Sequence, residues 1–155
     1  MAPLAAMKTL LDPECILLGA RADSVQQALE TASDLVHRRH GLRREKVTER
    51  LLRRERRGST ALGHGLALPH ADAAGLGRPV AAFVRLDEPV PFDAPDGAPV
   101  RDLLVLVVPR PAQASDFSML TRYRRLLSAP AFREALAACA DEGAIWRLFE
   151  AHEWR

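Results

Sequence analysis

Cysteine is scarce in this sequence, and long apolar runs are missing. The 155 residues include 2 cysteines, Cys15 and Cys139, whose separation matches no zinc or redox motif. We therefore expect reduced thiols and no disulfide framework. No apolar stretch approaches the ~20 residues that a helix needs to cross a bilayer, and residues 1–11 lack the apolar core of a signal peptide. These absences predict a cytoplasmic protein without membrane insertion.

Aromatic residues are few, at 5% of the chain, and none lies in its most basic segment, residues 38–57. The basic residues of this segment are Arg38, Arg39, Arg43, Arg44, Lys46, Arg50, Arg53, Arg54, Arg56 and Arg57. Nucleic-acid binding would call for aromatic side chains that stack on bases, or for a recognised reading motif, and the segment has neither. We therefore expect no nucleic-acid partner.

Two interpretations of the basic segment remain open. It can be a solvated helical surface, in which Glu49 and Arg53 form an i,i+4 ion pair. It can also be a docking face for an acidic protein surface.

The size and composition of the chain predict one folded domain. The apolar fraction of 48% is ordinary for a globular protein. There is no internal repeat, interdomain linker or low-complexity tail. We expect a single domain over residues 1–155, with its core over about residues 10–151.

Helical and strand patterns alternate along the chain. Ser24 and Gln27 fit a capping box at the start of a helix that ends at Gly41, and a basic helix follows over residues 44–57. The apolar run at residues 100–108 suits a central strand that is buried on both faces. The other predicted strands cover residues 10–18, 65–69 and 79–86; the other helices cover 115–127, 130–140 and 141–151; residues 71–78 and 89–99 are predicted to be loops and turns. This order predicts an α/β fold, a sheet covered by helices on both faces.

His70 stands out because of what precedes it. A glycine-rich loop over residues 58–65 leads into a short apolar stretch that stops at Pro69, and His70 follows directly. Imidazole is nucleophilic near neutral pH and can form a phosphoramidate. The setting therefore favours a histidine that accepts a charged group such as phosphate.

A phosphoryl group on His70 would need hydrogen-bond donors for its oxygens. The hydroxyls of Ser59 and Thr60 and the backbone N–H groups of the glycine-rich loop are candidates. Arg54 could add a bidentate, charge-assisted contact. On the residues alone, a structural histidine bonded to a carbonyl remains an equal alternative.

Other chemistry finds less support in the sequence. A zinc site built from His64, His70 and Asp72 would lack a further ligand at suitable spacing. Ser59 and Ser118 lack the surroundings of a hydrolase nucleophile. We expect no metal and no cofactor.

The segment around His70 closely resembles the signature of the mannitol/fructose-type EIIA domains of the bacterial phosphoenolpyruvate-dependent sugar phosphotransferase system, a group that includes the nitrogen-regulatory EIIA proteins. The matching pattern is Arg54-Glu55-x-x-Gly58-Ser59-Thr60-x-x-Gly63-x-Gly65-x-Ala67-x-Pro69-His70. Further similar stretches are Pro13–Ile16, Glu88–Val100 and Val107–Pro109, so the resemblance covers most of the chain.

The resemblance implies a mixed β-sheet flanked by helices. It also implies that His70 accepts a phosphoryl group from an HPr-like carrier protein and that Arg54 is an active-site residue. Nitrogen-regulatory members act on partner proteins through their phosphorylation state, and this is the function we expect. Two alternatives stay open: a sugar-specific EIIA that passes phosphate to an EIIB cysteine, and a regulatory binding module that is not phosphorylated.

Two departures from the family pattern bear on activity. A second active-site histidine is usual after the central strand, and Asp116 stands at the matching position. Asp72 stands where many relatives have a small or basic residue. Both are expected to add negative charge near the phosphate, at about 1–4 kcal/mol for each like charge. His64 could supply the second imidazole if it contacts His70.

Overall fold

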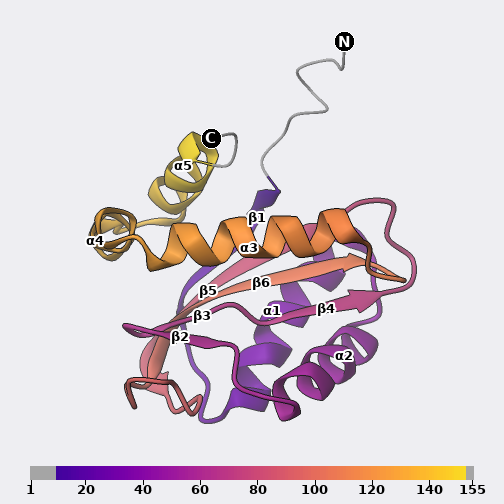
Figure 1. Ribbon diagram of the computed structural model, residues 1–155, viewed down its shortest axis with the longest axis horizontal. Coiled ribbons are helices and arrows are strands. Elements are labelled where there is room, and N and C mark those ends of the chain that lie inside the picture. The colour runs from indigo at the N-terminus through magenta and orange to yellow at the C-terminus, as the bar shows by residue number, and fades with distance from the viewer. Residues whose placement is uncertain (1–9, 153–155) are drawn as a thin grey trace.

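The computed structural model describes residues 10–152, which form a mixed sheet between two layers of helices (Figure 1). The elements in chain order are β1 (Leu11–Ala20), α1 (Val25–His40), α2 (Arg44–Arg56), β2 (Ala61–Gly63), β3 (Leu66–Ala67), β4 (His70–Ala73), β5 (Val80–Val90), β6 (Val100–Pro109), α3 (Ala114–Ser128), α4 (Pro130–Ala138) and α5 (Glu142–His152). The strand order is β1-β5-β6-β3-β2, and β4 also pairs with β6. The predicted α/β fold with helices on both faces is confirmed. None of the helices within residues 10–152 is long and apolar enough to cross a bilayer.

The two helical layers cover separate apolar clusters. One cluster joins α1 and α2 to one face of the sheet, and the other joins α3, α4 and α5 to the opposite face. Strand β6 contributes alternate residues to both, for example Val105 to the first and Leu106 to the second. A continuous apolar run is what a strand covered on both faces requires, as the sequence predicted.

The first helix begins and ends at the predicted residues. The Ser24 hydroxyl accepts a hydrogen bond from the Gln27 N–H at 3.2 Å, which caps the N-terminus of α1. Gly41 follows the helix with φ 76°, and its N–H donates to the His37 carbonyl. A left-handed backbone of this kind is easiest for glycine, which explains why the helix stops there.

Three segments expected to be loops contain strands. The glycine-rich segment contains β2, residues 70–73 form β4, and β5 continues to Val90, whereas β3 lies within the strand predicted for residues 65–69. Each of these pieces is short or rich in glycine, proline or aspartate, so its own propensity does not favour a strand. Pairing with a neighbouring strand decides its conformation, and Val90 opposite Val100 is an example.

A buried ion pair ties the C-terminal helices to the sheet. Arg85 on β5 lies directly opposite Asp102 on β6, and its Nε and Nη2 atoms donate to the two carboxylate oxygens at 2.8 and 3.0 Å. The same guanidinium donates to the carbonyls of Leu136 and Cys139 at the end of α4. Residues 85 and 102 are only 6% and 8% exposed.

Removing Asp102 should leave the positive charge of Arg85 buried without its carboxylate partner. We expect Asp102→Ala to lower the free energy of unfolding by about 3–5 kcal/mol, measured by urea denaturation. As a control, Arg38→Ala removes a surface pair with Asp34, in which the arginine side chain is 72% exposed, and should cost less than about 1 kcal/mol. Equal losses in the two variants would contradict the structural role of the buried pair.

Candidate functional site

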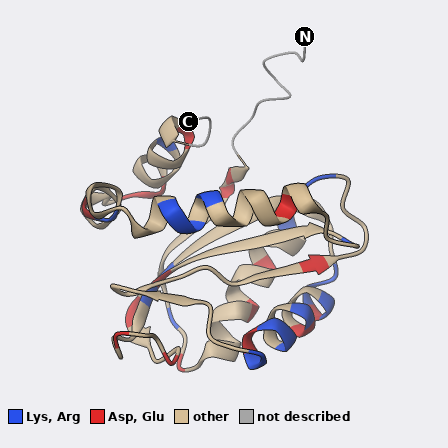
Figure 2. Ribbon diagram, viewed as in Figure 1, with Lys and Arg blue, Asp and Glu red and all other residues tan. Residues whose placement is uncertain are grey.

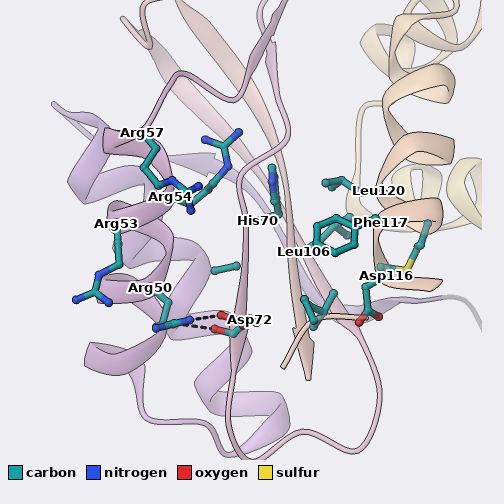
Figure 3. Close-up of a pocket in the computed structure, with 14 residues that line it drawn as sticks. Arg50, Arg53, Arg54, Arg57, His70, Asp72, Leu106, Asp116, Phe117 and Leu120 are labelled. Carbon is teal, nitrogen blue, oxygen red and sulfur yellow. Dashed lines mark hydrogen bonds and ion pairs between the residues drawn. The ribbon is translucent and has the colours of Figure 1, made fainter. Parts of the chain in front are cut away.

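The break at Pro69 positions His70. Strand β3 pairs in parallel with β6 up to Ala67, and β4 resumes that pairing at His70, which lies beside Leu106. The Pro69 carbonyl accepts a hydrogen bond from the Leu106 N–H at 2.9 Å, so the chain stays attached to β6 across the break. His70 is thereby fixed at the edge of the sheet, between α2 and α3 (Figure 3).

A hydrogen bond fixes the imidazole of His70. Its Nδ1 lies 2.9 Å from the Leu68 carbonyl oxygen. A carbonyl oxygen can only accept, so Nδ1 carries the hydrogen and donates it. In the neutral ring, the lone pair is then on Nε2. A nucleophilic nitrogen is therefore available on a half-buried ring that lines a cleft.

The surroundings of His70 favour its neutral form. Burial lowers the pKa of His70 below its usual value, and the positive charges of Arg54 and Arg124 lower it further, while the bond to Leu68 acts in the opposite direction. The neutral form is the nucleophile, so these effects keep His70 reactive near neutral pH.

The cleft next to His70 has a volume of about 540 Å³ and two unlike walls. Helix α2 and Arg57 directly after it supply a basic wall, and α3 and β6 supply an apolar one (Figure 3). The basic wall consists of Arg50, Arg53, Arg54 and Arg57; the apolar wall consists of Leu106, Val108, Phe117, Met119 and Leu120. Figure 3 shows Phe117 and Leu120 pointing toward His70 from α3.

Arg54 is held in place by the chain that follows its helix. Its Nη1 donates to the Gly58 carbonyl at 2.8 Å. This bond leaves the other guanidinium donors of Arg54 available on the cleft side. Figure 3 shows the Arg54 side chain beside the His70 ring. The structure thus brings two of the predicted site residues together.

Asp72 does not leave an uncompensated charge beside His70, contrary to expectation. Arg50 donates from Nη2 to its carboxylate and from Nε to its carbonyl, as the dashed lines in Figure 3 mark. Burial raises the pKa of Asp72, but the hydrogen bond and the positive charge of Arg50 outweigh this and lower it overall. The ion pair neutralises Asp72 locally, and the expected repulsion of a phosphate is reduced.

Asp116 caps a helix, whereas the sequence suggested that it takes the place of a second active-site histidine. Its Oδ2 accepts a hydrogen bond from the Gln113 N–H at 2.8 Å, and the Gln113 side chain accepts one from the Asp116 N–H. This reciprocal capping box starts α3. Although Asp116 lines the cleft, its carboxylate points away from His70 in Figure 3. Among the described contacts, it makes no hydrogen bond to the imidazole.

The expected phosphate loop is closed by its own hydrogen bonds. The Ser59 hydroxyl donates to the Phe92 carbonyl, and the Thr60 hydroxyl donates to the Glu55 carboxylate. The Thr60 N–H donates to the same carboxylate, and the Ala61 N–H donates to the Ser59 hydroxyl. Neither Ser59 nor Thr60 lines the cleft. Their role in the structure is to fix the chain between α2 and β2.

His64 lies at the other end of the β3–β4 segment from His70. It occupies the turn between β2 and β3 with φ 57°, and its N–H donates to Asp96 at 2.8 Å. Leu66 pairs with Asp102 and His70 with Leu106, which are about 13 Å apart along a strand that rises about 3.3 Å per residue. The structure does not bring His64 to His70, which corrects the idea of a second imidazole.

The zinc alternative also lacks a site. Within residues 10–152, no three histidine, cysteine, aspartate or glutamate side chains come together as a metal would require. Asp72 is engaged by Arg50, and His64 is remote from the cleft.

Sequence reasoning missed Phe117 and did not assign Arg50, Arg53 and Arg57 to the site. The spacing of the arginines was a usable signal, because positions three, four and seven residues apart share one helix face. Phe117 offered no such signal. It is 61% exposed, although an amphipathic reading of α3 would have counted it as an ordinary apolar residue.

Comparison with known proteins gives a consistent family match. A family model described as "Phosphoenolpyruvate-dependent sugar phosphotransferase system, EIIA 2" matches residues 9–152. A protein named nitrogen regulatory protein from Bradyrhizobium diazoefficiens is 36% identical over 139 residues, which cover 90% of this chain and 91% of the relative. A protein of the same name from Pseudomonas aeruginosa is 33% identical over 143 residues, with coverage of 92% and 93%.

Solved structures agree with this match. The crystal structure of nitrogen regulatory protein IIA-Ntr from Neisseria meningitidis superimposes with a TM-score of 0.84 at 33% identity, covering 95% of this chain and 99% of that one. The IIA mannitol structure from Escherichia coli gives a TM-score of 0.72 at 20% identity, with coverage of 89% and 97%, and supports the fold alone.

The neutral state of His70 can be measured directly. In an NMR titration of the ring protons, we expect a protonation midpoint below pH ~6.5, the usual value for histidine, because the ring is half-buried and faces arginines. His70→Ala assigns the signal. A midpoint above the usual value would contradict this description of the site.

The same titration tests the position of Asp116. Because its carboxylate caps α3, Asp116→Ala should leave the His70 midpoint within about 0.3 pH unit of the wild-type value. A carboxylate that bonded the ring would stabilise the imidazolium, so its removal would instead lower the midpoint clearly.

Proposed function

Since the chain belongs to the EIIA 2 family of the phosphoenolpyruvate-dependent sugar phosphotransferase system, we propose that it is a phosphocarrier with His70 as its acceptor. His70 receives a phosphoryl group from an HPr-like carrier protein. The phosphorylation state of the chain then controls a protein partner.

The observation that carries this proposal is the bond from Nδ1 of His70 to the Leu68 carbonyl. It selects one tautomer, and that tautomer has its lone pair on Nε2. A histidine that served only to support the fold would not need to line an arginine-walled cleft. The combination favours a nucleophile over the structural alternative.

The transfer step can be written with the atoms of this site. The lone pair of Nε2 attacks the phosphorus of the carrier's phosphohistidine. The new N–P bond forms as the carrier's N–P bond breaks, and the electron pair of that bond leaves with the carrier's imidazole nitrogen. Nδ1 of His70 keeps its proton throughout, and the Leu68 carbonyl stabilises the positive charge that develops on the ring.

Arg54 is the side chain that supports the transferred group in this proposal. Its guanidinium lies beside the ring, and the bond to Gly58 reduces its freedom. A planar guanidinium can donate two parallel hydrogen bonds to phosphoryl oxygens. Because Asp72 is paired with Arg50 and Asp116 caps α3, neither carboxylate offsets this charge fully. This arrangement favours a phosphorylated protein over a module that only binds partners.

The relatives favour regulation over sugar transport. The proteins from Bradyrhizobium diazoefficiens and Pseudomonas aeruginosa are both named nitrogen regulatory proteins and align over nearly their whole length. By contrast, the fructose-specific EIIABC component of Bacillus subtilis is 30% identical over a region that makes up 17% of that protein. We therefore place the chain with the regulators, with transfer to an EIIB cysteine as the alternative.

A labelling assay tests the acceptor. With phosphoenolpyruvate, enzyme I and an HPr-like carrier, we expect an acid-labile, base-stable phosphate on the wild-type protein. His70→Ala should lose essentially all of it, because the nucleophile is gone. His64→Ala is the matched control, since it removes an imidazole outside the cleft and should keep the wild-type rate.

Two outcomes would overturn the proposal. Label that survives His70→Ala would place the phosphate on another residue. An unlabelled wild-type protein, beside an active EIIA from another source, would favour the binding module that is not phosphorylated.

A further inference from the structure

The basic wall of the cleft contains arginines whose charge is not paired within the described structure. Arg50 pairs with Asp72, and Arg54 is bonded to Gly58. Arg53 and Arg57 are exposed, and within residues 10–152 their guanidinium groups have no hydrogen-bond or ion-pair partner. The Glu49–Arg53 pair that the sequence suggested does not form. Glu49 instead lines a separate groove between α1 and α2.

The other acidic residues of α2 also make contacts away from Arg53 and Arg57. Glu55 accepts hydrogen bonds from Thr60, and Glu45 lies beside Arg44 at the start of the helix. Figure 2 shows the basic residues along α2 together with the acidic ones between them, and none of the acidic residues of this helix lines the cleft. Apart from Arg50, which Asp72 neutralises, the wall formed by Arg53, Arg54 and Arg57 therefore presents positive charge to the cleft.

The opposite wall is mainly apolar and open to solvent, and its one acidic side chain, Asp116, caps the start of α3. Phe117 is 61% exposed, and Met119 and Leu120 beside it are half-buried. A large exposed aromatic residue next to a reactive histidine is typical of a contact surface, and aromatic and arginine side chains are the residues most enriched at such surfaces.

We propose that the protein partner which docks over His70 is acidic on one side of its contact surface and apolar on the other. Its carboxylates meet Arg53 and Arg57, and an apolar side chain packs on Phe117. This inference rests on the proposed function, because the docked partner is the one that exchanges the phosphoryl group. A small anion would satisfy the arginines but would leave the Phe117 wall uncovered, so the two walls together favour a protein.

The positive charge of the basic wall also favours release of an acidic donor after it has transferred its phosphoryl group. A phosphoryl group on His70 brings about two negative charges to the basic wall. It therefore competes with the partner's carboxylates for the arginines, and it repels them. An acidic donor is bound more tightly before transfer than after it, and its release follows from the transfer itself.

The experiment compares two phosphoryl donors. Phosphoramidate is a small donor that needs no docking surface, whereas a phosphorylated HPr-like carrier must dock. The quantity to measure is the ratio of the His70 labelling rate with the carrier to the rate with phosphoramidate. This ratio isolates docking from the chemistry of the imidazole.

Two double variants with the same net charge make the comparison specific. Arg53→Gln with Arg57→Gln removes the unpaired charges of the cleft. Arg43→Gln with Arg56→Gln is the matched control, because both residues are exposed on or next to α2 but lie outside the cleft. Glutamine keeps a good helix propensity in both.

We expect the ratio to fall by about tenfold in the cleft variant and by less than about twofold in the control. Raising the salt from about 50 mM to about 500 mM should lower the wild-type ratio and have a smaller effect on the cleft variant. Phe117→Ser, at an exposed position, should lower the ratio without changing its salt dependence.

A ratio that is equal in both double variants, or higher in the cleft variant, would overturn the acidic-partner inference. It would leave the proposed function intact as long as His70 is labelled, whereas failure of both donors to label His70 would overturn the function itself. If ATP or inorganic phosphate at about 1 mM and constant ionic strength blocks carrier labelling in wild type but not in the cleft variant, the arginines bind a small anion and the inference is wrong.

Discussion

Strand β6 is the constraint on which the site depends. It is buried on both faces, and it pairs with β5 on one side and with β3 and β4 in turn on the other. Because β3 and β4 both pair with β6, the strand can be interrupted at Pro69 while the chain keeps its register on β6. The break turns the Leu68 carbonyl toward the imidazole two residues later. A tautomer is thus selected by backbone geometry, and no other side chain has to orient the ring.

The charged groups around the cleft are also held by contacts within the structure. Two carboxylates near the cleft could have opposed an anion, and each is engaged elsewhere: Asp72 by Arg50 and Asp116 by the first turn of α3. Arg54 is steadied by a carbonyl, which costs it no positive charge. The result is an imidazole whose neutral form is favoured because it is half-buried near arginines, beside donors that remain charged. The proposed transfer needs this combination, because the acceptor must be unprotonated while the donors around it stay positively charged.

Much of the fold could be predicted from local sequence, and less of the site. Ser24 and Gly41 predict the two ends of α1, and an unbroken apolar run predicts β6. Each of these signals depends only on residues close together in the sequence. The partners of Ser59 and Asp72 lie 33 and 22 residues away, so no spacing rule could reveal that these groups were already bonded. His70 and Arg54 came from a motif. The free arginines and Phe117 emerged only when α2 and α3 were placed on either side of the sheet edge.

The most direct test of this account is the position of the phosphate on the imidazole ring. Protein labelled with ¹⁵N in its histidines and phosphorylated in the carrier system can be examined by ¹⁵N and ³¹P NMR, which distinguish the two ring nitrogens. Because Nδ1 donates its hydrogen to the Leu68 carbonyl, we expect phosphate on Nε2 of His70. Phosphate on Nδ1 would require that bond to be broken, and would contradict this expectation.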